Sequence, residues 1–432
     1  MASNPDNQIS HAEIFMNLRA VVCLPAIAII FASPAQAKED QKKITLGDYV
    51  QHVAEHSPEA ANIMADTLRS EADVVESIQW NNPEIQIDST VAKDNAGRDL
   101  EIEVEQPLRG SDFGARLGFA QAVQTLKEPE QKARLLDLSH QATRAYMDLW
   151  LAQEKVNLLS RIVKDAKRQS KTVIDAAAQG LTDKAESSIF TTEAEELTLQ
   201  RSALAAEYKR FLIAFVRLSG LSSGNYVLAK PEQKILPKSA GELLSLSENE
   251  SSVKAILSGR QNVASQRMAV AKADAALPEV TPRAVLNRNF SEDSTAMSFG
   301  VRFALPVWSQ NQPEILRAKA DYQSTSAALQ ALSENDFPSV LALAWETAKE
   351  NQKIADKYEK VVVPSWRNVQ KLTENKLGQG QASVFDLWKI RARVLESEMQ
   401  ALESRRSAVE SVLSLENLSG TAFSDSIVKG DK

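Results

Sequence analysis

Over most of this chain, apolar residues recur every three or four positions, the pattern of amphipathic helices. It runs from Leu46 to Gln79, where Asn81-Asn82-Pro83 ends it, and then over two much longer stretches. Those are Ser111 to Ala178, with a predicted kink at Pro129, and 311–377, interrupted by three prolines (Pro313, Pro338 and Pro364). At 1.5 Å per residue each would be roughly 100 Å long. Since no compact core covers such helices, we expect them to pair as coiled coils or to pack on other subunits.

A shorter helical segment follows each long stretch and is predicted to return antiparallel to it. These segments are Asp183 to Ser219 and Ser383 to Ser419. The first of them and the segment from Leu46 to Trp80 together match one long helix in length. We therefore expect the two to stack end to end beside it.

Two other segments alternate apolar and polar residues, which predicts β-hairpins. In the first, strands on either side of a turn at 94–97 have an apolar face and an acidic face. In the second, the predicted strands are Arg283 to Phe290 and Ala296 to Leu305, and the turn is 291–294. An isolated hairpin is marginally stable, so both need partners. One possibility is a soluble core; the other is further strands.

The whole arrangement occurs twice, at an offset of about 200 residues. Arg217-Leu218-Ser219-Gly220 recurs as Asn417-Leu418-Ser419-Gly420, and Gly180 matches Gly380. The predicted first repeat is 38–220, with its hairpin at 84–106 and long helices at 111–219. The second is 251–420, with its hairpin at 283–305 and long helices at 311–419. A non-helical crossover linker at 221–250 joins them, and 421–432 is a polar tail.

The amino-acid composition is typical of a protein with long helices, and the net charge limits the kinds of partner that the chain can bind. Charged residues make up 25% of the chain, aromatic residues 6%, and the net charge is -7, which argues against a nucleic-acid partner. Residues 1–37 resemble a secretory signal. Its positively charged segment begins at Met16, the predicted start codon, and includes Arg19; an apolar run covers 20–31, and a small-residue cleavage pattern ends at Ala37. The lone cysteine, Cys23, lies in this segment. We expect an exported chain without disulfides.

Candidate catalytic chemistry is sparse. His52 and His56 are spaced as metal ligands on one helical face, and with Glu55 they fit the pattern His-x-x-Glu-His. No third ligand is evident nearby in the sequence, so a surface pair is the preferred interpretation and a metal site the alternative. We found no nucleophile elbow or phosphate loop. We therefore expect a protein that is not an enzyme and has no cofactor.

Local motifs add a family resemblance over roughly residues 44–420. They are Gln106-Pro107-Leu108 with Gly114-Ala115-Arg116, its second copy from Ala304 to Trp308, and the turn from Lys376 to Asp386. With the duplication, the hairpins and the export signal, these motifs resemble the TolC-type outer-membrane efflux proteins. The resemblance implies a mainly α-helical trimer whose hairpins close a 12-stranded β-barrel in the outer membrane of a Gram-negative bacterium. The long helices would continue as a hollow α-helical barrel in the periplasm. Closure would also remove exposed sheet edges.

The resemblance assigns roles to the two helical tips and to the strand faces. The tips would contact a periplasmic adaptor protein through Gly180, Leu181, Thr182, Asp183, Gly380, Gln381, Ala382 and Ser383. Candidate residues of a periplasmic gate are Glu186, Asn375 and Asp386. The polar strand faces would line the barrel lumen and contact water. The candidate lumen residues on them are Glu84, Asp88, Glu101, Glu103, Glu105, Arg288 and Arg302. These carboxylates either favour cations or simply keep the lumen wet.

The implied function is that of the outer-membrane channel in a tripartite exporter. It would conduct substrate passively from an inner-membrane pump and its adaptor to the exterior, while outer-membrane lipid surrounds the barrel. The alternative is a periplasmic coiled-coil adaptor or spacer without a barrel. Two helical hairpins, each accompanied by an amphipathic strand pair, favour the channel.

Overall fold

A computed structural model gives the fold of this chain. It describes residues 43–91, 98–180, 183–222, 224, 226–232, 235–277, 279–303, 310–333 and 336–423, except the side chains of residues 186, 333 and 336. The predicted signal segment, the first hairpin turn and most of the polar tail lie outside these residues. Within the described ranges, no helix combines the length and the apolar character needed to cross a bilayer.

The first half begins with two helices where one was predicted. These are α2 (Leu46–His56) and α3 (Pro58–Ile78). The break comes at Ser57, which adopts an extended backbone, because proline disfavours a helical conformation in the residue before it. Ser57 then caps α3 by accepting a hydrogen bond from the Ala60 amide. β2 (Glu84–Val91), β3 (Arg98–Glu105), the 3₁₀ turn η2 (Gly110–Phe113), α4 (Ala115–Ala178) and α5 (Lys184–Ser219) follow. α4 continues through Pro129 to the predicted end at Ala178, but it begins at Ala115 rather than at Ser111, because Gly114 has φ of 118° and 110–113 form the 3₁₀ turn.

The second half has the same order of elements but differs in detail from the predictions. A short strand, β4 (Val227–Leu228), pairs with β1 (Lys43–Ile44). The linker contains a helix, α6 (Ala240–Glu250), capped by Ser239, so the prediction of a non-helical segment to residue 250 was wrong. α7 (Ser252–Ala276) leads into β5 (Val280–Asn289) and β6 (Ser294–Phe303), which begin three and two residues earlier than predicted. The predicted end of the second strand, at 304–305, lies outside the described residues.

The second long helical stretch is described over 312–333 and 336–378, and the latter part contains a π-helical turn, unlike α4. It comprises α8 (Gln312–Ser333), α9 (Asp336–Lys357), a π-helical turn η3 (Tyr358–Val362) and α10 (Val363–Gly378). α11 (Val384–Ser419) returns from it. Pro338 lies in the first turn of α9. Pro364 instead follows η3 within continuous helical backbone, where the Val363 amide donates to the Tyr358 carbonyl five residues back, and this π-turn accommodates the proline.

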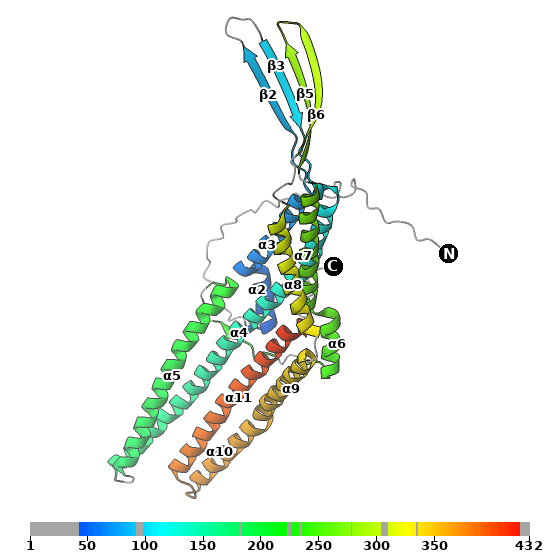
Figure 1. Ribbon diagram of the computed structural model, residues 1–432. Helices are drawn as coiled ribbons and strands as arrows, with labels where there is room; N and C mark the ends of the chain where they lie inside the picture. Colours follow the sequence, from blue (N-terminus) through cyan, green and yellow to red (C-terminus); the bar gives the residue numbers. More distant parts are fainter. Residues whose placement is uncertain are drawn as a thin grey trace. The chain divides into compact units, whose positions relative to one another are not determined.

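The helices pack as antiparallel pairs, α4 with α5 and α11 with α9 and α10 (Figure 1). α4 also contacts α3 and α7, and α7 contacts α8. α2 and α3 contact both α4 and α5, which confirms the predicted stacking beside the long helix.

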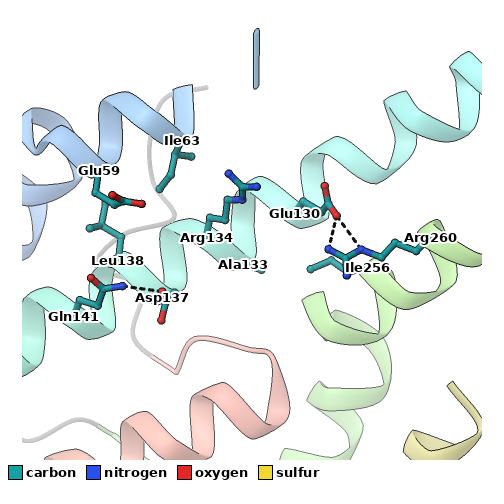
Figure 2. A pocket seen from close by; sticks show the side chains of 10 residues that line it. All are labelled: Glu59, Ile63, Glu130, Ala133, Arg134, Asp137, Leu138, Gln141, Ile256 and Arg260. Carbon is teal, nitrogen blue, oxygen red and sulfur yellow. Dashed lines mark hydrogen bonds and ion pairs between the residues drawn. The ribbon is translucent and has the colours of Figure 1, made fainter. Parts of the chain in front are cut away.

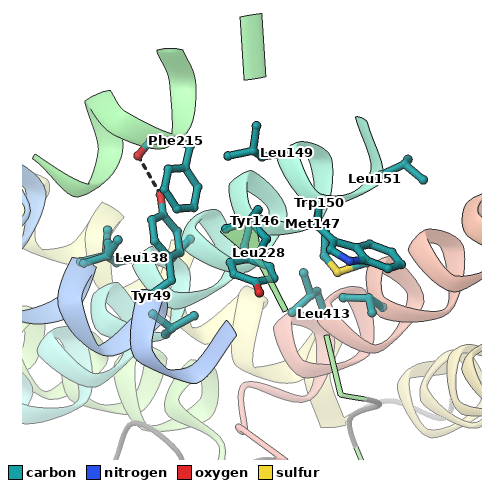
Figure 3. Packing of buried hydrophobic residues seen from close by; sticks show 14 of the residues in the cluster. Tyr49, Leu138, Tyr146, Met147, Leu149, Trp150, Leu151, Phe215, Leu228 and Leu413 are labelled. Atoms are coloured by element: carbon teal, nitrogen blue, oxygen red, sulfur yellow. Dashed lines mark hydrogen bonds between the residues drawn. The ribbon is translucent and has the colours of Figure 1, made fainter. Parts of the chain in front are cut away.

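The largest hydrophobic cluster joins α2, α4, α5 and α11 (Figure 3). In it, the rings of Tyr49 and Phe215 stack at 3.9 Å, and the Tyr49 hydroxyl donates to the Phe215 carbonyl at 2.9 Å. The Tyr146 hydroxyl lies 2.8 Å from the Ile44 carbonyl oxygen and 2.7 Å from that of Ala229. Burial raises the pKa of both tyrosines well above the ordinary range, so these phenols stay protonated donors.

Candidate functional site

The two hairpins, far apart in sequence, form one antiparallel sheet in the order β2-β3-β5-β6 (Figure 1). β3 pairs with β5 from Asp99 opposite Asn289 to Glu105 opposite Arg283. β2 and β6 are the two edges of this sheet. Since β2 and β6 run in opposite directions, the edges of two copies are suited to antiparallel pairing.

One face of the sheet is polar. The register aligns Glu84 with Glu105 and Asp88 with Glu101 across β2 and β3. On the same face, Arg302 reaches Glu105, with nitrogen–oxygen distances of 2.6 and 3.1 Å. The lumen candidates apart from Arg288 therefore share a single face; they are Glu84, Asp88, Glu101, Glu103, Glu105 and Arg302.

Arg288 is the exception, and its assignment to this polar face was wrong. The register places Arg288 opposite Leu100 on one side and Thr295 on the other, which is the apolar face. The reason is the two-residue period of a strand. Arg283, an odd number of residues away, takes the polar face instead and lies 3.2 Å from Glu103. Sequence reasoning missed Arg283. Because Arg283 and Arg288 are an odd number of residues apart on one strand, they must lie on opposite faces of the sheet, so only one of them can lie beside the acidic residues.

The polar face is divided by charge along the strands. Near the helical end, Glu103 and Glu105 form ion pairs with Arg283 and Arg302. Nearer the turns, Glu101 accepts a hydrogen bond from Asn287 at 3.4 Å, and Asp88 accepts one from the Gln86 side chain at 2.8 Å. Amide donors leave the negative charge in place, so the turn half of this face is more acidic than the helical half.

The opposite face is apolar and exposed. Phe299 is 79% exposed and Ile85 is 66% exposed, although such side chains are normally buried. The exposed apolar strand residues are Ile85, Ile87, Val91, Val104, Met297, Phe299, Val301 and Phe303. A contiguous apolar surface of this kind marks a contact with another protein or with lipid.

The two helical tips are tight turns built on glycine. Gly180 and Gly380 both have φ of 71°, the left-handed conformation that glycine adopts without strain. Asp183 then caps α5 by accepting from the Ala185 amide at 3.1 Å. Gln381 and Ala382 lie in the second turn, where the Gln381 amide donates to the Lys376 carbonyl at 2.8 Å. Leu181, Thr182 and the side chain of Glu186 lie outside the described residues.

The second tip has a reciprocal cap. Ser383 and Asp386 form a reciprocal capping box: each amide donates to the other side chain, both at 3.0 Å. The hydrogen bond from the Ser383 amide, followed by that from its hydroxyl, lowers the pKa of the Asp386 carboxyl. Asn375 has an exposed side chain, and its carbonyl accepts from the Gln379 amide. Both residues stay candidates for a gate, but Asp386 has a structural role as well.

We expect Asp386→Ala to loosen the first turn of α11. Because the pKa of Asp386 is lowered, its ionised form stabilises the turn above the ordinary aspartate range. This support is lost as the pH falls through the lowered pKa. Amide hydrogen exchange over residues 384–390 measures it, and exchange should be faster in Asp386→Ala than in the control Asn375→Ala. Equal exchange in the two variants would contradict the cap.

Other candidate chemistry does not form a site. The rings of His52, which is half-buried, and His56, which is exposed, stack at 4.6 Å. Across the described residues, no set of three His, Cys, Asp or Glu side chains is arranged to hold a metal ion. A hollow of about 350 Å³ lies between α3, α4 and α7 (Figure 2). Its charged groups pair with neighbours, as when Arg260 donates to Glu130 at 2.8 and 3.0 Å. We assign no ligand to it.

Comparison with known proteins gives matches in structure. No family model and no curated protein sequence matches the chain. The Campylobacter jejuni CmeC outer membrane channel has a TM-score of 0.71 at 15% identity, over 91% of this chain and 92% of that one. The Vibrio cholerae outer membrane protein VceC has 0.67 at 15% identity, over 88% and 97%. The open state of the Neisseria gonorrhoeae MtrE outer membrane channel has 0.68 at 14% identity, over 87% and 89%. The chain therefore has the fold of outer-membrane channels, which is the fold that its resemblance to the TolC-type proteins implied.

Proposed function

We propose that this protein is the outer-membrane channel of a tripartite efflux or secretion system. It conducts substrate passively from an inner-membrane pump and a periplasmic adaptor to the exterior. The observation that carries the proposal is the two-faced sheet, with exposed apolar side chains on one face and charged ones on the other. A membrane pore needs this division between lipid and water.

Strand length and direction support a barrel made from three copies. β5 and β6 have 10 residues each, the length that crosses an outer membrane when tilted. Four strands are too few to enclose a pore, whereas three sheets joined β6 to β2 give twelve strands without a free edge. The apolar face then meets lipid and the polar face lines the lumen.

Exposed apolar side chains on the helices support the same assembly. α3, α4, α7 and α8 pack in that order, so α3 and α8 are the outer members of this group. On α3, Met64 is 69% exposed and Leu68 is 65% exposed, and on α8 Leu316 is 63% exposed. In a closed ring, the α3 edge of one copy covers the α8 edge of the next, which buries both.

The helical tips are the proposed contact with the adaptor, and the gate lies beside them. Both tips end in glycine turns, which let partner helices approach closely. Adaptor binding favours the open arrangement of the helical pairs by binding it more tightly than the closed one.

The test is to purify the mature chain from the membrane fraction in mild detergent and add it to a planar bilayer. A trimeric mass together with discrete conductance steps supports the proposal. A monomer that stays in solution without detergent and gives no conductance contradicts it, and favours an adaptor or spacer.

Ion selectivity should depend on the turn half of the lumen. Asp88→Asn with Glu101→Gln removes two carboxylates per chain, so the reversal potential in a KCl gradient should shift toward anions. Glu105→Gln with Arg302→Gln also changes two residues, but it removes a neutral ion pair. This control should leave the reversal potential almost unchanged. Equal shifts in both variants would show that the division of charge along the lumen has no effect.

A further inference from the structure

Two arginines lie on the apolar face of the sheet, both close to the turns. Arg288 is opposite Leu100 on β3, and Arg98 is opposite Val91, two residues further along the same face of β3. Arg98 is exposed, and its carbonyl accepts from the Phe290 amide at 2.8 Å, beside the turn of the second hairpin. The two cationic side chains are therefore neighbours on adjacent strands.

The contacts of Arg288 hold its guanidinium close to the turn of the second hairpin. It donates to the Thr295 hydroxyl at 2.7 Å, forms an ion pair with Asp293, and lies 5.8 Å from the centre of the Phe290 ring. A guanidinium has five N–H donors, of which these contacts use two. The side chain is 37% exposed. It is thus oriented, and donors remain for a further acceptor.

The position of the pair coincides with the end of the apolar surface. Val280, at the helical end of β5, is eight residues from Arg288, roughly 26 Å along the strand at 3.3 Å per residue. In a strand tilted by about 40° this length rises roughly 20 Å, and Arg98, level with residue 290, rises roughly 25 Å. The apolar band of an outer-membrane barrel is about 25 Å tall. Arginine on the lipid face is costly at mid-membrane but nearly free of cost at the interface. Arg98 and Arg288 therefore lie where acyl chains give way to headgroups.

We propose that Arg98 and Arg288 form a binding site for the phosphate of an anionic lipid headgroup, at the turn end of the lipid-facing surface. The inference rests on the proposed function, because it requires this face to contact a membrane. Arginine suits the ligand because its planar fork of donors matches phosphate oxygens. Three copies would place six such arginines around the barrel.

The test is retention of phosphatidylglycerol against phosphatidylcholine by the intact purified protein, measured by native mass spectrometry from mixed micelles. The wild type should prefer phosphatidylglycerol. Arg98→Gln and Arg288→Gln should each reduce that preference about fivefold, the effect of one basic residue near an anionic surface. Lysine at both positions keeps the charge and should keep most of the preference. Inorganic phosphate should not displace the lipid.

The matched control is Arg283→Gln, on the same strand but on the polar face. Its lipid preference should equal that of the wild type. Equal retention of both lipids by the wild type, equal losses in all three glutamine variants, or displacement by inorganic phosphate would overturn the inference. If conductance persists in those cases, the channel function survives and the lipid site alone fails. If the wild type neither inserts nor conducts, both fail together. Should the variant with lysine at both positions not fold, the single glutamine variants decide.

Discussion

Phe299→Arg should abolish channel formation. Phe299 lies near the middle of β6, is 79% exposed, and is opposite Ala284 on the apolar face. Arginine at the bilayer midplane on the lipid face of a barrel costs about 2–4 kcal/mol per chain, and a trimer incurs that cost three times. We therefore expect almost no protein in the outer-membrane fraction and no conductance steps from the purified variant.

The matched control is the neighbouring residue. Ser298→Arg introduces the same side chain one position away, on the polar face opposite Val285. There the guanidinium faces water and the acidic residues of β3, so insertion and conductance should persist. Normal insertion of Phe299→Arg, or loss of insertion in Ser298→Arg alone, would contradict the assignment of lipid to the apolar face.

Local patterns predicted the strands and most helices because their causes are local. Alternation of side chains along β2 and β3 depends on neighbours in sequence, so the acidic face was evident without a structure. The same holds for the glycine turns at Gly180 and Gly380, where a helix must end and reverse. The repeat of the pattern at an offset of about 200 residues further predicted that the elements follow the same order in both halves.

The errors come from long-range pairing and from cooperative helix formation. Which face Arg288 occupies depends on the register of β5 against β3, a strand far away in sequence. Proline also had different effects at different positions. Pro129 is accommodated inside α4, whereas Pro58 begins a new helix. The local sequence resembles a helix in both cases, and packing decides the outcome.

The two halves differ where they meet, a difference that sequence periodicity could not reveal. His140 on α4 is completely buried, with Nε2 2.9 Å from a carboxylate oxygen of Glu416 on α11 and Nδ1 2.8 Å from the Asn417 side-chain oxygen. The other Glu416 oxygen accepts from the Phe423 amide at 2.9 Å. At the offset of the repeat, the chain has Val216 in place of Glu416 and Val340 in place of His140. The buried polar contact between His140 on α4 and Glu416 on α11 therefore has no counterpart at the corresponding positions of the other half.

Glu416→Leu should destabilise the folded chain by about 2–5 kcal/mol, since it removes one of the two polar partners of the buried His140 and the acceptor of the half-buried Phe423 amide. Guanidinium unfolding of the purified protein measures this, with the fluorescence of Trp150, buried in the adjoining cluster, as the signal. Glu410→Leu is the control on the same helix. Glu410 also pairs with α4, through Arg144 at 3.0 Å, but both side chains are partly exposed. Its loss should cost at most about 1 kcal/mol.

The double variant His140→Leu with Glu416→Leu separates a missing partner from a missing contact. When both members of a buried pair become apolar, no polar group of the pair is left unsatisfied, and stability is often kept or raised. We therefore expect the double variant to recover most of the loss seen in Glu416→Leu. A double variant as unstable as the single one would mean that the Phe423 amide carries the effect. Glu416 would then stabilise the fold mainly by holding Phe423 against α11, rather than by linking α4 to α11.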